Sequence, residues 1–309
     1  WKLVDDDVIL MVAPASHIFG QSMITAACVA NASISFLPRF EPEAFLKTIE
    51  RDGVTFFAGV PTLAHFMLNS PIVGNYNLSS LRKIMLSGAP LHPEIAQKLK
   101  QRFKVEIVTG YGMTEGVPVC FLTGEAYDRA PEGSVGLPAF GTSLRIVDEN
   151  DEDVPLGEAG EILLRGPQMF KEYHNRSQET TTAWRNDWFH TGDIGKQDQN
   201  GHYYIVERLK DIIKRSGYAV SPSEVERVLL NHDAVAEAAV IGIPHEALSE
   251  EIKAFIVRKQ GSSITDKELI AFCKTYLAAF KYPRIIEFRD SLPKNPTGKI
   301  LRRLLREDS

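Results

Sequence analysis

Glycine, a hydroxyl and a carboxylate stand close together in Gly110-Tyr111-Gly112-Met113-Thr114-Glu115, which follows an apolar run. A dinucleotide fingerprint requires a third glycine where Glu115 stands, so this sequence does not match it. A loop of this composition can still wrap a nucleotide, because Tyr111 offers a stacking face, Thr114 can reach phosphate and Glu115 can hold Mg²⁺. A glycine turn before a capped helix explains the same residues equally well.

A lysine near the C-terminal end follows glycine in Gly298-Lys299. A Walker A loop is excluded, because Pro293 stands where glycine is required and Ile300 replaces the Ser/Thr. The prolines that precede Lys299 predict instead a stiff extended loop that presents this lysine at a fixed place. The basic residues that follow are expected to form a solvated helix face: Arg302, Arg303 and Arg306.

An aspartate and a group of cations lie in the middle of the chain. Asp193 follows a glycine in Thr191-Gly192-Asp193, where it is either an ordinary cap or Asx turn, or a carboxylate that accepts from two ribose hydroxyls. From Arg208 to Arg215, four cations fall within eight residues. A hinge, an anion site and an exposed turn are all consistent with this cation group.

The histidines and cysteines give weaker signals. His17 lies at the end of a predicted strand, where a lone histidine is more often structural than catalytic. The sequence has no Ser-His-Asp arrangement, no His/Asp/Glu cluster with metal-site spacing and no Cys-x-x-Cys pair. Its three cysteines lie far apart, which argues against a disulfide framework and fits a reducing compartment. We therefore expect a cytoplasmic protein.

Length and composition indicate an ordinary globular protein of two or three domains, with 309 residues, 44% hydrophobic and 24% charged. The net charge of −5 gives no general attraction to nucleic acid or anionic membrane. The apolar stretch from Val8 to Pro14 is far shorter than the roughly 20 residues of a transmembrane helix, so no transmembrane segment is expected. The chain opens at Trp1 without Met, which we interpret as a fragment boundary.

Residues 1–116 alternate strand and helix signals, which predicts a mostly parallel sheet covered on both faces. The predicted strands are Val8–Val12, Ile34–Leu37, Val54–Ala58, Lys83–Leu86 and Val105–Val108. The predicted helices are Ser22–Ala30, Glu43–Arg51, Leu63–Leu68 and Pro93–Arg102. Ligands of such sheets bind beyond the carboxyl ends of the strands, so the loops that follow the strands are the candidate binding segments.

The rest of the chain predicts two smaller parts. Residues 117–208 contain short β runs between turn residues and are expected to form a β-barrel-like subdomain. Residues 209–309 are expected to form an α+β domain, with Ser221 capping a helix to Leu230 and a strand at Ile285–Phe288. The fold class is therefore α/β, with a parallel subdomain, a small β subdomain and a C-terminal α+β domain.

The order of the motifs is more specific than any one of them. The chain resembles the adenylate-forming superfamily, which includes acyl- and aryl-CoA synthetases, peptide-synthetase adenylation domains and beetle luciferases. The resemblance covers essentially the whole chain and rests on five motifs in order: Ser87-Gly88-Ala89-Pro90, Tyr111–Glu115, Thr191-Gly192-Asp193, Glu207–Lys214 and Pro296-Thr297-Gly298-Lys299.

The resemblance implies a role for each matching residue. Gly88, Ala89 and Pro90 would line the adenine and acyl pocket beside Gly110, Tyr111 and Gly112, with Thr114 on phosphate and Glu115 on magnesium. Asp193 and Arg208 would hold the ribose, and Lys210 would be the hinge of a mobile C-terminal domain. Lys299 would contact the carboxylate and the α-phosphate in one conformation. The residues implied for the second, thiol-accepting conformation are Lys214, Ser216 and Gly217, and those for the acyl pocket are His17, Phe19, Val60 and Met113.

Two departures from the family pattern carry expectations of their own. Family members have a Ser/Thr/Gly-rich loop ending in Pro-Lys-Gly that grips the β- and γ-phosphates, and this chain contains no such run. We therefore expect these residues by themselves to be weakly active or inactive. In Leu248-Ser249-Glu250-Glu251, relatives often have glycine before the acidic pair, which puts contacts on the thiol side in doubt.

Within the family, the sequence favours an ATP-dependent acyl-CoA synthetase that uses Mg²⁺ and coenzyme A, because Ile300-Leu301-Arg302-Arg303 and Ser87–Pro90 are more like those enzymes. Its partners would be a small carboxylic acid, ATP and CoA, with no nucleic acid. The alternatives are another acceptor, such as a carrier protein or a luciferase-like reaction, and a non-catalytic nucleotide-binding module. The identity of the acid is not predicted.

Overall fold

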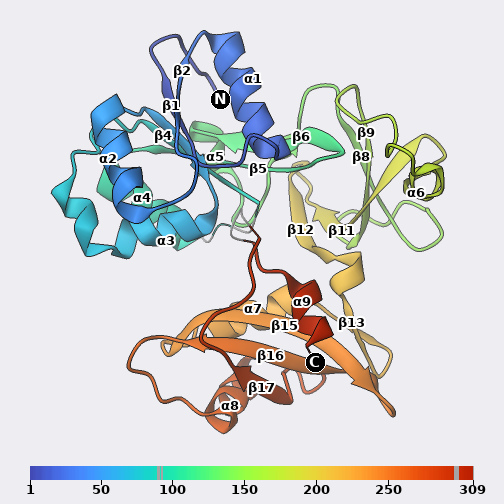
Figure 1. The fold of residues 1–309 in the computed structure, drawn as a ribbon. Coiled ribbons are helices and arrows are strands. Elements are labelled where there is room, and N and C mark those ends of the chain that lie inside the picture. The colour runs from blue at the N-terminus through green and yellow to red at the C-terminus, as the bar shows by residue number, and fades with distance from the viewer. Residues whose placement is uncertain (89–90, 92, 296–298, 309) are drawn as a thin grey trace. The chain divides into compact units, whose positions relative to one another are not determined.

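Short apolar runs near the N-terminus form the centre of a seven-stranded sheet of order β2-β1-β3-β4-β5-β6-β7 (Figure 1). The computed structural model describes residues 1–88, 91, 93–295 and 299–308. Strands β1 to β5 pair in parallel, and β6 and β7 continue the sheet antiparallel. The strands are β1 Val8–Met11, β2 Ser33–Phe36, β3 Phe56–Gly59, β4 Lys83–Ser87, β5 Glu106–Met113, β6 Gly116–Thr123 and β7 Leu137–Pro138.

Helices cover both faces of this sheet, because its central strands are apolar on both sides. In β1, Leu10 packs on one face with Phe45 of α2, while Ile9 and Met11 pack on the other with Met23 of α1. The first face also carries the buried residues of α3 and α4. The helices are α1 Ile18–Ala30, α2 Pro42–Asp52, α3 Pro61–Asn69, η1 Pro71–Asn75, α4 Pro93–Phe103 and α5 Glu125–Arg129.

The segment expected as a loop after the fifth strand is instead part of the sheet. Strand β5 runs on to Met113 and turns directly into β6, so the boundary expected after residue 116 falls inside β6, a strand of the same sheet. The glycines allow this pairing, since a Cβ at Gly110 would lie 2.8 Å from the carbonyl oxygen of Cys120. Helix α1 also begins earlier than expected, at Ile18 rather than Ser22.

A second sheet has the order β10-β11-β9-β8, with β12 paired to β11. Its longest strand, β11, was not expected, and Asp193 lies inside it rather than after a turn. Gly192 still has a φ of +66°, so the strand is irregular at that residue. The elements are β8 Ser143–Val147, β9 Gly160–Arg165, α6 Ser177–Ala183, β10 Trp184–Arg185, β11 Trp188–Gln197 and β12 Tyr203–Arg208.

The third sheet has the order β14-β13-β16-β15, with β17 paired to β16. Helices α7 and α8 contribute to the core on one face, and Leu305 of α9 packs on the other. Ser221 caps α7 as expected, and β17 has its expected bounds. The elements are η2 Leu209–Asp211, β13 Ile213–Arg215, β14 Tyr218–Val220, α7 Pro222–Leu230, β15 Val235–His245, β16 Ser249–Arg258, α8 Asp266–Tyr276, β17 Ile285–Phe288 and α9 Arg302–Glu307.

The chain divides into two compact units, which are described separately below. The first unit comprises Trp1–Glu158, Ile162–Thr191 and Lys196–Ile205. The second comprises Ala159–Glu161, Gly192–Gly195 and Val206–Ser309. Asp193 therefore belongs to the same unit as Arg208 and Lys299, although more than 100 residues separate it from the lysine.

Candidate active site

In the first unit, the candidate nucleotide-binding residues lie at the carboxyl ends of neighbouring strands β4 and β5. Gly88 follows β4 with a φ of +84°, a left-handed conformation that favours glycine. A Cβ at this position would lie 3.7 Å from Cγ1 of Val60, which follows β3, so two predicted binding segments adjoin. Ala89 and Pro90 lie outside the described residues.

Strand β5 carries the next predicted group, Gly110 to Met113. The side chains of Tyr111 and Met113 pack against a cluster that contains Val119 and Phe189. Gly112 approaches Val117 of β6, where a Cβ would come within 2.9 Å of a methyl carbon. The two glycines thus allow the close pairing of β5 with β6, and this structural role does not depend on a ligand.

Glu115, in the turn between β5 and β6, is held by two aromatic residues of a distant segment. Its Oε1 accepts a hydrogen bond of 2.7 Å from the hydroxyl of Tyr173, and its carbonyl oxygen accepts one of 2.8 Å from the N–H of Phe170. The rings of Phe170 and Tyr173 lie 4.7 Å apart between centroids. Burial, together with the Glu115 carboxylate, raises the pKa of the Tyr173 phenol, which therefore stays a donor.

These contacts fit a role for Glu115 in holding Mg²⁺. The Tyr173 hydroxyl fixes the orientation of a hard oxygen ligand, as partners of metal-binding carboxylates do. Among the described residues, no group of three or more His, Cys, Asp and Glu side chains is placed to hold a metal ion. A magnesium ion bound with a nucleotide needs no such group, because phosphates supply the other ligands.

The four predicted acyl-pocket residues do not share one cluster. His17 is exposed and caps α1, since its Nδ1 accepts from the N–H of Phe19 at 3.1 Å. Phe19 packs on the α1 face of the sheet, Val60 packs with the core that contains α2 to α4, and Met113 packs with the cluster around Val119. A structural role accounts for the observed contact of His17.

In the second unit, the two predicted ribose ligands bind each other. Nε of Arg208 lies 2.8 Å from Oδ1 of Asp193, whose side chain is only 4% exposed. The charges of Asp193 and Arg208 also affect the pKa of Lys299. Surrounding protein and the Arg208 guanidinium lower the pKa of the Lys299 ammonium, and Asp193 opposes that shift. The fold thus brings Asp193, Arg208 and Lys299 into one electrostatic neighbourhood.

Lys299 contacts Asn295, which precedes the segment for which the stiff extended loop is predicted. The N–H of Lys299 donates to Oδ1 of Asn295 at 2.9 Å, and its carbonyl oxygen accepts from the N–H of Asn295 at 2.9 Å. Lys294 and Ile300 form a β-bridge that closes the loop. Pro296 to Gly298 lie outside the described residues.

Of the three tail arginines expected on a solvated helix face, Arg302 departs from that expectation. The Arg302 side chain is 20% exposed and lies 2.7 Å from a carboxylate oxygen of Glu226 on α7. Arg306 lies 2.9 Å from Asp211 but is 36% exposed, and Arg303 is 74% exposed, so both side chains keep contact with solvent as expected. Partial burial of Arg302 is possible because other elements supply carboxylates, which the local sequence does not reveal.

Two family models match the chain. One, described as AMP-binding enzyme, matches residues 1–174, and the other, the AMP-binding enzyme C-terminal domain, matches residues 224–299. The chain belongs to the AMP-binding enzyme family. The expected adenylate-forming fold is thereby confirmed.

Curated members of the AMP-binding family align over almost the whole chain. A long-chain-fatty-acid–CoA ligase of Bacillus subtilis (strain 168) is 37% identical over 97% of this chain and 54% of its own length. A feruloyl-CoA synthase of an Amycolatopsis species is 36% identical over 97% of this chain and 61% of its length. The chain thus spans little more than half the length of these relatives.

Solved members of the family share the fold. The crystal structure of ATP-bound MatB from Rhodopseudomonas palustris matches with a TM-score of 0.90 and 32% identity, over 100% of this chain and 61% of that one. An amide bond synthetase, McbA from Marinactinospora thermotolerans, matches with a TM-score of 0.88 and 28% identity, over 98% of this chain and 61% of that one.

The residues that the family resemblance assigns to the thiol step lie at one hairpin of this AMP-binding enzyme. Ser216 and Gly217 form the two-residue turn between β13 and β14, with φ of +51° and +80°, as a type I′ turn requires. Lys214 is exposed on β13, and Lys210 is exposed in η2. Arg215, which follows Lys214, anchors the hairpin through a bidentate ion pair with Glu251 at 2.7 and 3.0 Å.

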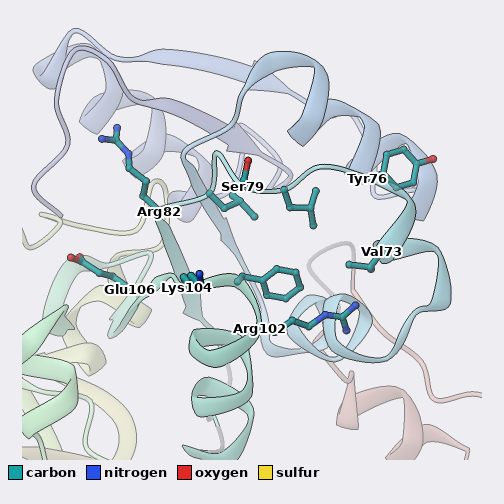
Figure 2. Close-up of a pocket in the computed structure, with 11 residues that line it drawn as sticks. Val73, Tyr76, Ser79, Arg82, Arg102, Lys104 and Glu106 are labelled. Carbon is teal, nitrogen blue, oxygen red and sulfur yellow. The ribbon is translucent and has the colours of Figure 1, made fainter.

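A pocket of about 700 Å³ lies elsewhere in the first unit. Figure 2 shows Arg82 and Glu106, which stand next to the start of β4 and at the start of β5, on its wall. The candidate nucleotide residues lie at the opposite, carboxyl ends of these strands, so this pocket is not their site. Among the described residues, no helix is long and apolar enough to cross a membrane.

Sequence patterns did not reveal Tyr173, which contacts a candidate site residue, or Glu226, which contacts Arg302 of the tail. Tyr173 binds Glu115 from 58 positions away, and Glu226 binds Arg302 from 76 positions away. No motif or spacing links either pair, so only the folded chain could identify them.

Proposed function

We propose that the polypeptide carrying this chain uses ATP to convert a carboxylic acid into an acyl-adenylate and then transfers the acyl group to coenzyme A. The observation that carries the proposal is the grouping of Asp193, Arg208 and Lys299 in one unit. The names of the curated relatives, a fatty-acid–CoA ligase and a feruloyl-CoA synthase, support the same reaction class.

The chemistry accounts for these residue types. A free carboxylate is a poor acyl donor, because oxide is a very poor leaving group. Attack of the carboxylate on the α-phosphate of ATP releases pyrophosphate and forms a mixed anhydride, from which AMP leaves readily. Two anions approach each other in this step, so a cation such as Lys299 stabilises the charge of the transition state.

The remaining residues would bind and orient the substrates. Asp193 and Arg208 would hold the ribose hydroxyls, with the Asp193 carboxylate oriented by the guanidinium. Glu115 would hold Mg²⁺, which when bound neutralises phosphate charge. In the thiol step, rotation about Lys210 would replace Lys299 by the hairpin that carries Lys214, Ser216 and Gly217.

The two half-reactions test this function separately. The assay uses the longest open reading frame that carries residues 1–309, with saturated fatty acids and hydroxycinnamic acids as substrates. We expect acid-dependent release of pyrophosphate, and then CoA-dependent release of AMP with formation of a thioester. Tight binding of an acyl-sulfamoyl-adenosine without any acid-dependent turnover would favour a non-catalytic nucleotide-binding module.

The acceptor is tested in the same assay. Because one solved relative is an amide bond synthetase, the panel includes a primary amine and a carrier protein beside CoA. Thioester formation with CoA at the highest kcat/KM is the expected result. Preference for the amine or the carrier protein, or light emission from the adenylate, would replace CoA in the proposal and leave the adenylation step standing.

A further inference from the structure

The second unit contains a buried cluster of charged residues that none of the proposed chemistry uses. Nη2 of Arg302 lies 2.7 and 2.9 Å from the two carboxylate oxygens of Glu226, and Nε lies 3.2 Å from one of them. Nη1 of Arg302 lies 3.3 Å from Asp211 and 3.7 Å from Glu207. One guanidinium thus faces carboxylates of three elements: the end of β12, η2 and α7.

The geometry makes Arg302 the connection between these elements. The side chains of Glu207, Asp211 and Glu226 are 3%, 10% and 15% exposed, so each needs a partner inside the protein. Glu207 also accepts from the Ser221 hydroxyl and the Ser223 N–H at the start of α7. A guanidinium suits this place, because its planar fork offers five donors in fixed directions, whereas a lysine ammonium offers three donors at a single point.

Arg302 lies directly after the loop that carries Lys299. The loop is closed by the bridge between Lys294 and Ile300 and by a 2.8 Å hydrogen bond from the N–H of Leu301 to the carbonyl oxygen of Pro293. Lys294 is itself tied to Glu237 of β15 at 2.7 Å. The side chain of Arg302 is therefore an anchor of this loop on its C-terminal side, three positions from the candidate catalytic cation.

The same side chain reaches the predicted hinge. Asp211 follows Lys210 directly, and it is bound by both Arg302 and Arg306 of α9. The position of the Lys299 loop and that of the hinge segment are thus set by one ion cluster. A turn about Lys210 would carry Asp211, α9 and the loop together as a rigid body.

We propose that Arg302 is a positioning residue, which through Glu226 and Asp211 holds the Lys299 loop in the place that adenylation requires and couples it to the hinge. The proposal rests on the proposed function for the role of Lys299. It assigns no contact with substrate to Arg302.

The first test needs no catalytic activity and uses the 309-residue chain. Acetic anhydride labels lysines only as free amines, so mass spectrometry of labelling against pH reports the titration of Lys299. Four charged groups act on it: Arg208, Asp193, Arg302 and Asp211. Arg302→Gln removes a cation and leaves carboxylates without a partner, so the midpoint of Lys299 labelling should move to higher pH.

Arg303→Gln is the matched control, because Arg303 is the next residue of α9 and pairs with Glu307 at the surface. It should leave the labelling of Lys299 unchanged. A native labelling curve in a folded Arg302→Gln chain, or the same shift in Arg303→Gln, would overturn the proposal.

The second test separates the half-reactions in the longest open reading frame. Arg302→Gln should slow adenylation by about 10²-fold, as small displacements of catalytic groups do, and leave thioester formation from supplied acyl-adenylate within about threefold of the native rate. Arg302→Lys should recover the charge but only part of the adenylation rate. Equal losses in both half-reactions would show that Arg302 has only a general structural role.

A second variant serves as a control for the case in which Arg302→Gln does not fold. If Arg302→Gln unfolds, the double variant Arg302→Gln with Glu226→Gln removes both charges of the buried pair and is compared instead, since such replacements preserve folding better than single ones. Native adenylation in a folded double variant would sink the proposal. If the unaltered protein adenylates no acid, the proposed function fails, whereas the labelling test still decides whether Arg302 acts on Lys299.

Discussion

Arg208 and Asp193, which the sequence places 15 residues apart as separate ribose ligands, form an ion pair with 2.8 Å between Nε and Oδ1. The aspartate is 4% exposed and the arginine 41%, so the guanidinium orients a buried carboxylate and keeps a solvent-facing edge. The proposed nucleotide site would therefore include a preformed pair, in which each member affects the other.

Loss of this pair should weaken nucleotide binding. Asp193→Ala removes a charged acceptor and should raise the dissociation constant of ATP by about 10- to 100-fold, as expected for a hydrogen bond to a charged group. Isothermal titration calorimetry measures this dissociation constant. Arg208→Ala in the Asp193→Ala background should add little, because the pair acts as a unit. Fully additive losses would contradict a coupled pair.

Lys299 and Lys214 should affect opposite half-reactions. Lys299→Ala is expected to slow adenylation by roughly 10²-fold or more, through loss of charge stabilisation in the transition state, and to spare thioester formation from supplied acyl-adenylate. Lys214→Ala should do the reverse. Rates of pyrophosphate release and of CoA-dependent AMP release distinguish the two steps. Equal effects of both changes on both steps would contradict the two-conformation assignment.

Tyr173 should set the magnesium requirement. Tyr173→Phe removes the 2.7 Å hydrogen bond to Glu115, and the concentration of Mg²⁺ that gives half-maximal ATP binding should rise by about 10-fold, as for other partners of metal-ligating groups. Tyr204→Phe is the control, since it deletes a similar bond of 2.9 Å to Asp198. An equal magnesium dependence in the two variants would exclude a role for Tyr173.

Ser249→Gly should stabilise the second unit. Ser249 stands where relatives often have glycine, and its φ of +67° is in the left-handed region. Relief of this conformation should raise the free energy of unfolding by about 1 kcal/mol in denaturant titrations. Gly261→Ala is the control for the opposite change. Gly261 has a φ of +82° and no atom within 4 Å of an added Cβ, so the alanine should lower the stability through the backbone conformation alone. No gain from Ser249→Gly would mean that its hydroxyl offsets the strain.

Asp7 should make the first unit sensitive to acid. Burial acts to raise the pKa of Asp7, but hydrogen bonds from Thr55 and Val4 and the charge of Arg82 outweigh it and hold that pKa below its ordinary value of 3.8. A lowered folded-state pKa contributes stability above pH 3.8, and this contribution is lost as the pH falls through the folded-state value.

Asp7→Asn should therefore cost about 1 to 3 kcal/mol near pH 7, and progressively less below pH 4, in denaturant titrations at each pH. Asp6→Asn, at an exposed neighbour, should change stability by less than about 0.5 kcal/mol at either pH. A pH-independent cost of Asp7→Asn would assign the effect to packing instead of charge.

The sequence by itself determined the order of elements and the family. The apolar runs at Val8 and Lys83 both became strands of one parallel sheet, and Ile285–Phe288 is a strand with its expected bounds. Ser221 caps α7 because a hydroxyl before a helix satisfies a free N–H whatever surrounds it. Such features depend on neighbours in the chain, and local patterns therefore predict them.

Only the tertiary structure decided which charged side chains are buried and how far β5 extends. β5 runs through its glycines because β6 lies beside them, and Arg302, expected in solvent, is only 20% exposed because Glu226 and Asp211 of other elements bind it. Burial of an ion depends on partners that distant segments supply, and no local pattern contains that information. For the same reason, the sequence could name Lys299 as a candidate catalyst, but not the residues that hold it in place.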